Sequence, residues 1–359
     1  MAQVGETSTR TPRDKTGATV VTNDDSIRLS AASLFLAGKA SDNIGAFIQW
    51  TYDNGDPRHS NIDNVDIRGS WQLTLADKEV ILGVTLHNNP TVQDVWNSTP
   101  AFGFPYTSSP DAIGIPFSTM IDGGLGQLVA GTGAYAYWDR SIYGELSFYR
   151  TADGAFSSLR AGIPQADRVK LDGENPYWRF AYNKEWGPHS LMLGTYGMHV
   201  GIYSDPHDNS SPINKFTDTA LDAQYQYITD PHVLTAQATW IHEKQQWNDN
   251  ALTGTNASDT LNTLKGKLTY YYQRKYGATL GAFSTTGSRD AELYADSPVG
   301  SPNTSGYIAE LDYLPTQNIR LMLQYTGFWK YWGASSNIDG NGRHASANNS
   351  LFLNLWFAF

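Results

Sequence analysis

The residues best able to carry chemistry in this 359-residue chain are charged side chains that recur at alternate positions of extended segments. They are Asp66, Arg68, Glu145, Arg179, Asp222, Lys265, Lys267, Glu310, Asp312 and Arg320. Charges of both signs at such positions are able to line a pore that selects ions or small solutes. They are equally able to solvate or brace the inside of a closed sheet. We predict them as pore-lining residues, and neither interpretation needs a catalytic residue.

Local motifs for catalysis or metal binding are missing from the sequence. The eight histidines show neither HxH nor HExxH spacing. No GxSxG, Walker or GxGxxG element occurs where a strand would lead into a helix. The absence of cysteine excludes thiolate metal sites, cysteine nucleophiles and covalent CxxCH haem attachment within the chain. We therefore predict a protein that is not an enzyme and has neither a metal site nor a cofactor of its own.

Aromatic residues concentrate in a long connecting stretch at about residues 88–126. Between residues 87 and 106, Trp96, Phe102, Phe104 and Tyr106 occur together with three prolines, so this part is too apolar for an ordinary solvent loop. Such a segment should be ordered, as a constriction inside a lumen, as a lid over its end, or by packing between outer loops. We predict that it folds inward and narrows the pore.

The charged residues lie on strands with a period of two. Between Ile319 and Tyr331, apolar residues such as Leu321 and Tyr325 alternate with Arg320 and Gln324. From about residue 27 onward the sequence repeats two alternating segments of about ten residues, joined by a tight turn and followed by a longer polar loop. Tyr and Trp crowd the strand ends, as they do at the two interfaces of a membrane. A soluble sandwich would instead favour compact aliphatic residues on its apolar face.

Composition supports the same fold class. Mean hydropathy is −0.42, and no run of about 18 apolar residues is present, which excludes a transmembrane helix. We predict an all-β protein, a transmembrane up-and-down antiparallel barrel of about sixteen strands, surrounded by the lipids of the bacterial outer membrane. The net charge of −10 without a basic stripe argues against a nucleic-acid partner.

The two ends of the chain carry different signals. Clear strands number about fifteen, and an even count would be completed by a weak strand near residues 18–22. We predict residues 1–25 as a flexible N-terminal segment and residues 26–359 as the barrel. The last segment ends on Phe359 and alternates like the terminal strand read by the outer-membrane assembly machinery. Its inner face carries Phe352 and Trp356, which favours a lumen in which something packs against them.

Three stretches of the N-terminal part, at residues 33–47, 63–68 and 88–97, resemble the barrel part of the outer-membrane fused cytochrome–porins. That family is linked to electron transfer across the outer membrane, including iron oxidation. Its members carry an N-terminal CxxCH haem domain, which this chain lacks, so no haem-ligating residue can be transferred. The resemblance leaves three alternatives: the haem domain has been removed, a separate c-type cytochrome is the partner of this barrel, or the chain is simply a porin. Haem is expected only where such a domain or partner supplies it.

Two functions follow from these observations. The leading hypothesis is a porin-type channel that passes small solutes or ions through its lumen. The alternative is the barrel sheath of an electron conduit that houses a cytochrome. An open lumen would favour the first and an occupied lumen the second. The sequence leaves open whether several copies of the chain associate.

Overall fold

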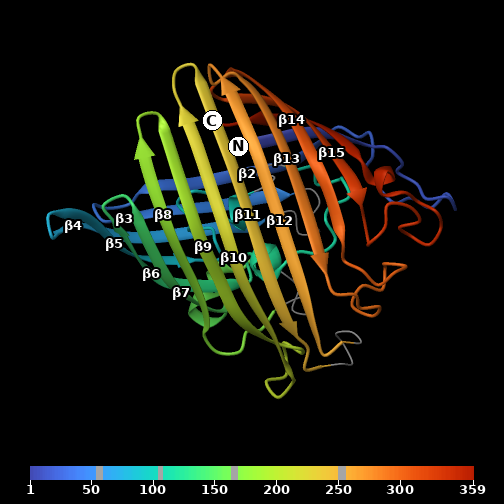
Figure 1. Cartoon of the computed structure of the whole chain (residues 1–359), viewed down its shortest axis with the longest axis horizontal. Coiled ribbons are helices and arrows are strands. Elements are labelled where there is room, and N and C mark those ends of the chain that lie inside the picture. The colour runs from blue at the N-terminus through green and yellow to red at the C-terminus, as the bar shows by residue number, and fades with distance from the viewer. Residues whose placement is uncertain (54–59, 104–107, 163–168, 250–255) are drawn as a thin grey trace.

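A computed structural model describes residues 1–53, 60–103, 108–162, 169–249 and 256–359. Sixteen strands within these residues close into one antiparallel barrel in which each strand pairs with its neighbours in sequence (Figure 1). β1 pairs with β16 and completes the ring. The prediction of an up-and-down barrel of about sixteen strands is therefore confirmed. In the described parts of the chain, no helix has both the length and the apolar character to cross a membrane.

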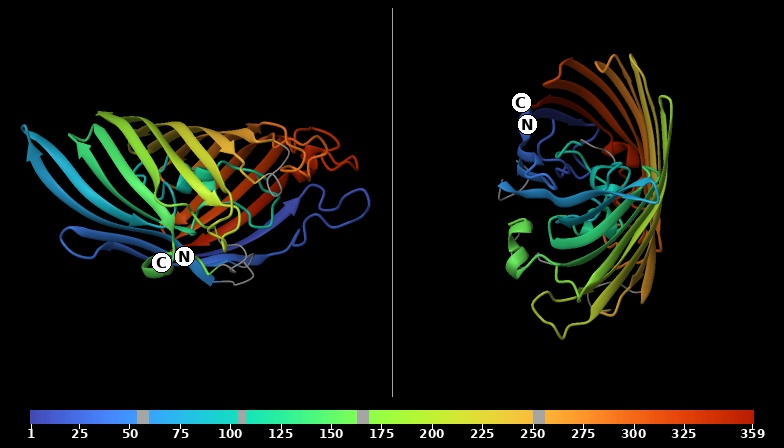
Figure 2. Two further views of the ribbon diagram at one scale, coloured as in Figure 1. Left: turned by 90° about the horizontal axis from the view of Figure 1, so that it is seen from below. Right: turned by 90° about the vertical axis from the view of Figure 1, so that its left-hand side faces the viewer.

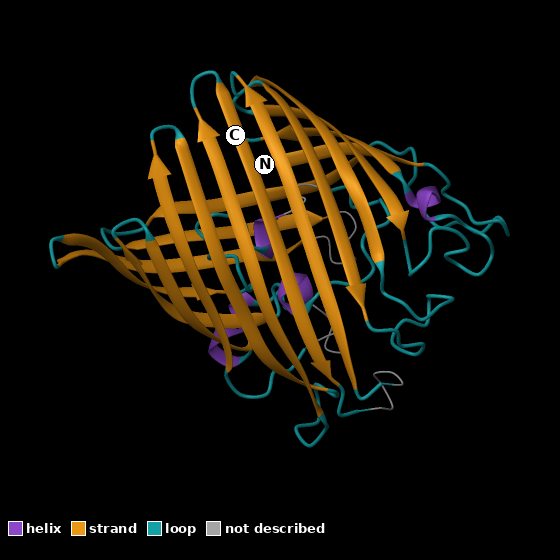
Figure 3. Ribbon diagram, in the orientation of Figure 1, coloured by secondary structure: helices purple, strands orange, loops and turns teal. Residues whose placement is uncertain are grey.

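The strands occupy most of the chain, and the helices are short turns between them (Figure 3). The strands are β1 (Ala2–Thr9), β2 (Arg28–Lys39), β3 (Ile44–Asp53), β4 (Ser60–Leu75), β5 (Lys78–His87), β6 (Val129–Trp138), β7 (Ile142–Thr151), β8 (Asn175–Trp186), β9 (His189–Tyr203), β10 (Ile213–Ile228), β11 (His232–Gln246), β12 (Ser258–Tyr272), β13 (Tyr276–Gly287), β14 (Thr304–Thr316), β15 (Ile319–Lys330) and β16 (Ser350–Phe357). The helices are α1 (Pro100–Gly103), η1 (Met120–Gly124), η2 (Gly154–Leu159) and η4 (Ala345–Asn348).

Alternation along each strand separates an apolar outer face from a polar inner face. In β15, Leu321 and Leu323 are exposed on the outside, whereas Met322 and Gln324 are buried on the inside. The exposed fraction of Leu280 on β13 reaches 64%, which would be unfavourable in water for a whole ring of such residues. A surface of this kind is what a membrane barrel presents to lipid.

Connections differ between the two ends of the barrel. At one end the strands are joined by tight turns, and Ala76 and Asp77 between β4 and β5 both have positive φ. The pairs Asp139–Arg140 and Gln273–Arg274 have the same conformation, as expected for hairpin turns that match the twist of the strands. Long loops join the strands at the other end. The predicted asymmetry of short turns and long loops is present.

The strand that completes the even number lies at a different place from the one that the sequence indicated. Ala2–Thr9 forms β1 and pairs along its whole length with Ser350–Phe357 of β16, so the prediction of a flexible segment is wrong for these residues. Residues 18–22 form no strand, only an isolated bridge between Thr19 and Arg13. The sequence pattern did not show β1 because Glu6 and Ser8 occupy outward positions of this strand, so its apolar residues do not alternate with polar ones. Pairing with β16 holds this strand in place instead.

The connection between β5 and β6, residues 88–128, enters the barrel; we call it the inward segment. Figure 2 shows it between the walls rather than over an end of the barrel. It carries α1 and η1, and η1 is a single-turn π-helix with non-helical dihedral angles at Asp122 and Gly123. Its hydrogen bonds and ion pairs to the inner wall define the candidate site.

Candidate functional site

The inward segment is fastened to β8 and β10 through a buried arginine. Arg179 is 1% exposed, and one of its guanidinium nitrogens lies 2.9 Å from a carboxylate oxygen of Asp222 and 3.1 Å from one of Asp94 in the segment. Ser98 of the segment also donates to Asp222. Removing three charges from water is unfavourable unless the groups pair well, so this cluster depends on the segment staying in place.

Trp96 adds an aromatic contact to the same anchor. Its ring lies 5.4 Å from the Arg179 guanidinium carbon and packs edge-on against Tyr143 and Tyr137. Tyr196 approaches Arg179 at 5.6 Å from the ring centroid. Trp96, predicted as part of a constriction or lid, thus lies inside the barrel. Phe102 belongs to α1, whereas Phe104 and Tyr106 lie outside the described residues.

A second anchor holds η1 against β10, β11 and β12. The backbone N–H of Met120 donates to Glu243 at 2.5 Å, and that of Ile121 donates to Asp218 at 3.1 Å. Lys265 on β12 lies 2.6 Å from Asp122 of the segment. Asp218 and Glu243 are direct partners in the β10–β11 register. Two neighbouring carboxyl groups therefore accept hydrogen bonds from the backbone N–H groups of the segment.

Other parts of the inward segment reach the remaining walls. The side-chain amide of Gln93 donates to Glu145 on β7 at 2.8 Å, and the Gln93 carbonyl accepts from Arg68 on β4. Asp111 pairs with Arg28 on β2 at 3.1 Å. Beyond it, Ile113 and Ile115 pack on an apolar cluster of the inner wall that includes Phe283, Ile308 and Phe328. The segment therefore crosses the lumen from one wall to the other.

The predicted pore-lining residues fall into three groups. Glu145, Arg179, Asp222 and Lys265 contact the inward segment, and the first three are almost fully buried. The prediction that they line an open path is wrong in this conformation, because the segment covers them. No local pattern in the sequence indicates this cover, since Asp94 and Asp122 lie far from their partners along the chain.

The other two groups lie on other parts of the inner wall. Asp66 borders the cavity described below and pairs with Arg68. Arg320 lies 2.7 Å from both Glu310 and Asp312, which joins β14 to β15 on the inner wall. Lys267 lies on β12, which β13 separates from β14, and interacts electrostatically with Glu310. The ion pairs of Arg320 brace β14 against β15, whereas Asp66 borders the cavity. The role of these residues in lining a pore stays a prediction.

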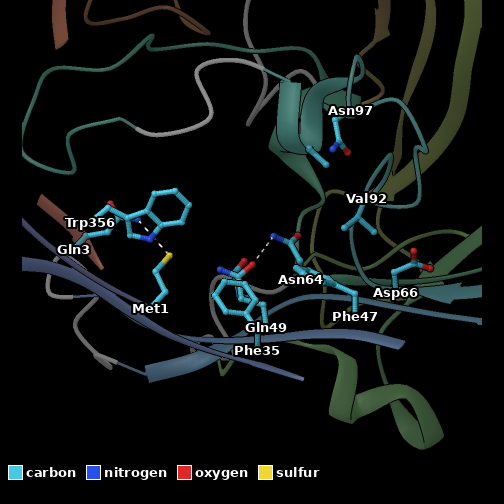
Figure 4. Close-up of a pocket in the computed structure, with 12 residues that line it drawn as sticks. Met1, Gln3, Phe35, Phe47, Gln49, Asn64, Asp66, Val92, Asn97 and Trp356 are labelled. Atoms are coloured by element: carbon cyan, nitrogen blue, oxygen red, sulfur yellow. Dashed lines mark hydrogen bonds between the residues drawn. The ribbon is translucent and has the colours of Figure 1, made fainter. Parts of the chain in front are cut away.

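An open cavity of about 500 Å³ remains between the inward segment and the wall formed by β1 to β4 and β16. Aromatic rings, amide side chains and carboxylates line it: Phe35, Phe47 and Trp356; Gln3, Gln49, Asn64 and Asn97; and Asp63 and Asp66. Figure 4 shows Trp356 beside Gln3 and Met1, and Phe35 beside Gln49. This part of the lumen is therefore polar, acidic and aromatic.

Several residues of the site were missed by the sequence analysis. Asp218 and Glu243 lie on polar faces of alternating strands, so the same pattern that identified Asp222 would have found them. Asp63 faces the lumen at an irregularity where Ile48 pairs with Val65 and Trp50 pairs with Ile62. Asp94 and Asp122 belong to the connecting segment, where no periodic pattern could identify them.

Comparisons with known proteins bear on the fold alone. No protein-family model matches the sequence, and no curated protein matches it. The outer membrane channel DcaP of Acinetobacter baumannii is similar in structure, with a TM-score of 0.52 and 11% identity over 100% of this chain and 95% of that one. An anion-selective porin from Comamonas acidovorans is similar at a TM-score of 0.51 and 13% identity, over 99% and 95% of the two chains.

These structural neighbours are outer-membrane porins and channels. At such low identity the likeness supports the barrel architecture alone. The resemblance to fused cytochrome–porins rests on the three sequence stretches only.

Proposed function

We propose that this chain is a porin-type channel of the bacterial outer membrane, which passes small solutes or ions through its lumen. The observation that carries the proposal is the open cavity of about 500 Å³ beside the inward segment. Its polar wall offers hydrogen-bonding and charged groups to a hydrated solute, as the walls of selective pores do. The apolar outer face and the likeness to an outer-membrane channel support the same function.

In this proposal the inward segment sets the width of the passage. It is tied to at least two opposite walls by Arg179, by Lys265 and by the apolar contacts of Ile113 and Ile115. Solutes would therefore pass along the β1 to β4 side rather than through the middle of the barrel.

The electron-conduit alternative places a cytochrome within the barrel. The inward segment occupies that space and is fastened by buried ion pairs, so a cytochrome would have to displace it and leave those charges unpaired. This conflict is why we favour the channel. A c-type cytochrome partner and association of several copies stay as predictions from the sequence.

The test is conductance of the purified, detergent-extracted protein in a planar bilayer. The intact chain should give single-channel steps, and deletion of residues 92–118 should raise their size because the constriction is removed. Deletion of residues 206–210 in the exposed loop between β9 and β10 is the control and should leave the steps unchanged. An intact barrel without current, which conducts only after residues 92–118 are removed, would contradict the channel.

A further inference from the structure

The charge of the lumen is unbalanced, and this imbalance bears on which solutes pass. We propose that the cavity beside the inward segment takes cations, and that it binds small organic ammonium ions more tightly than metal ions of the same charge. The proposal rests on the channel function proposed above and names the class of solute that the channel selects.

Acidic side chains outnumber basic ones on the described inner wall and inward segment. The carboxylates are Asp63, Asp66, Asp94, Asp111, Asp122, Glu145, Asp218, Asp222, Glu243, Glu310 and Asp312, and the basic side chains are Arg28, Arg68, Arg179, Lys265, Lys267 and Arg320. A low-dielectric wall that carries one sign of charge concentrates ions of the opposite sign. The lumen should therefore attract cations and repel anions.

At the cavity itself, the excess of negative charge comes from Asp63. Its carboxylate accepts hydrogen bonds from the Thr51 hydroxyl at 2.8 Å and from the Gln127 amide at 3.2 Å, both of which are neutral groups. Within the described residues it forms no ion pair, whereas the other carboxylate of the cavity, Asp66, is paired with Arg68. The negative charge of Asp63 is thus available to a solute.

Among the residues that the structure describes, the positive groups near the cavity are already engaged. The amino group of Met1 donates to the carbonyl oxygen of Ser33 at 2.9 Å. Arg320 lies between Glu310 and Asp312, and its guanidinium carbon lies 5.9 Å from the centre of the Trp356 ring. That contact also shows that an aromatic wall of this lumen accepts a cation at its face.

Two further rings distinguish organic cations from metal ions. Phe35 on β2 and Phe47 on β3 lie side by side with their centres 5.8 Å apart, and both border the cavity. The free-energy cost of dehydration is smaller for an ammonium ion with alkyl groups than for a metal ion. Such an ammonium ion can contact the ring faces and buries apolar surface there. A metal ion of the same charge must lose more hydration energy to contact the rings, and it buries no apolar surface there.

The experiment uses the full-length chain in planar bilayers, first with a KCl gradient. The reversal potential should show potassium passing about tenfold or more readily than chloride. Asp63→Asn should lower this ratio about fourfold, as expected for loss of one charge near the path. Asp208→Asn removes the same charge from an exposed loop and should leave the ratio unchanged. An anion-selective current would overturn the inference while leaving the channel function intact.

Block of the potassium current by tetraethylammonium tests the aromatic part. The blocking concentration should rise about fivefold in Phe35→Ala and in Phe47→Ala. Phe180→Ala, on the outer face of β8, is the matched control and should have no effect. Block that is absent, or equal in all variants, would overturn the preference for organic cations. No current under any condition would instead overturn the proposed channel function.

Discussion

The two sides of the lumen use the same kinds of inward-facing residue for different purposes. On the side of β7 to β12, polar side chains are covered by the inward segment and bonded to it, and Arg179 is the clearest case. On the side of β1 to β4, polar side chains such as Gln49 face the open cavity. An alternating strand therefore determines which way a charge points. Whether that charge braces the barrel or meets a solute depends on a segment far away in sequence.

The largest difference between the two sides should appear at Arg179. In Arg179→Met the side chain still fills space, but Asp94 and Asp222 lose their partner in a buried site. We expect a loss of about 3–5 kcal/mol in the free energy of unfolding. We also expect larger or noisier conductance steps, because the inward segment loses its main anchor.

The loss in free energy of unfolding is measured by urea unfolding in lipid vesicles, followed by tryptophan fluorescence. Arg150→Met is the matched control, since Arg150 pairs with Glu174 at 3.8 Å with both side chains about half exposed. That pair should contribute less than about 1 kcal/mol. Equal losses in the two variants would show that the segment is not fastened by the buried cluster.

The contrast between the two sides also marks the limit of what the sequence could predict. The period-two alternation identified most strands and the inward direction of residues such as Arg68 and Arg320, because each signal is local. β1 escaped detection because its outward residues Glu6 and Ser8 are polar and its place is fixed by pairing with β16. Partners such as Asp94 and Arg179 could not be matched, since the path of the inward segment brings them together.

Cysteines introduced one at a time should distinguish positions that face the lumen from positions that face outward, because the chain has no cysteine of its own. A membrane-impermeant thiol reagent should label cysteines at positions 68 and 320, which face the lumen, far faster than cysteines at positions 71 and 325, which face outward. A register slip of one residue would invert all four rates. The measurement is the rate of labelling in intact vesicles.

Position 147 extends this test to the covered side. Ser147 on β7 is fully buried and donates to Glu145 at 2.8 Å, so a cysteine there should stay unlabelled until the protein is unfolded. Rapid labelling at position 147 in the folded barrel would mean that the inward segment leaves this wall regularly, and the two sides would no longer differ.

The smallest stability effect is expected on the open side, at Gln49. Its amide donates to the Thr51 hydroxyl at 3.1 Å and to the Ser33 hydroxyl at 3.4 Å, and it accepts a hydrogen bond from Asn64 at 3.4 Å. Two of these three contacts are long, so the side chain is weakly held. Water in the cavity can replace these bonds, and Gln49→Ala should change the free energy of unfolding by less than about 0.5 kcal/mol. The same substitution widens the cavity and should raise conductance measurably. A variant that loses stability without a change in conductance would show that this wall, too, serves as a brace and that the passage runs elsewhere in the lumen.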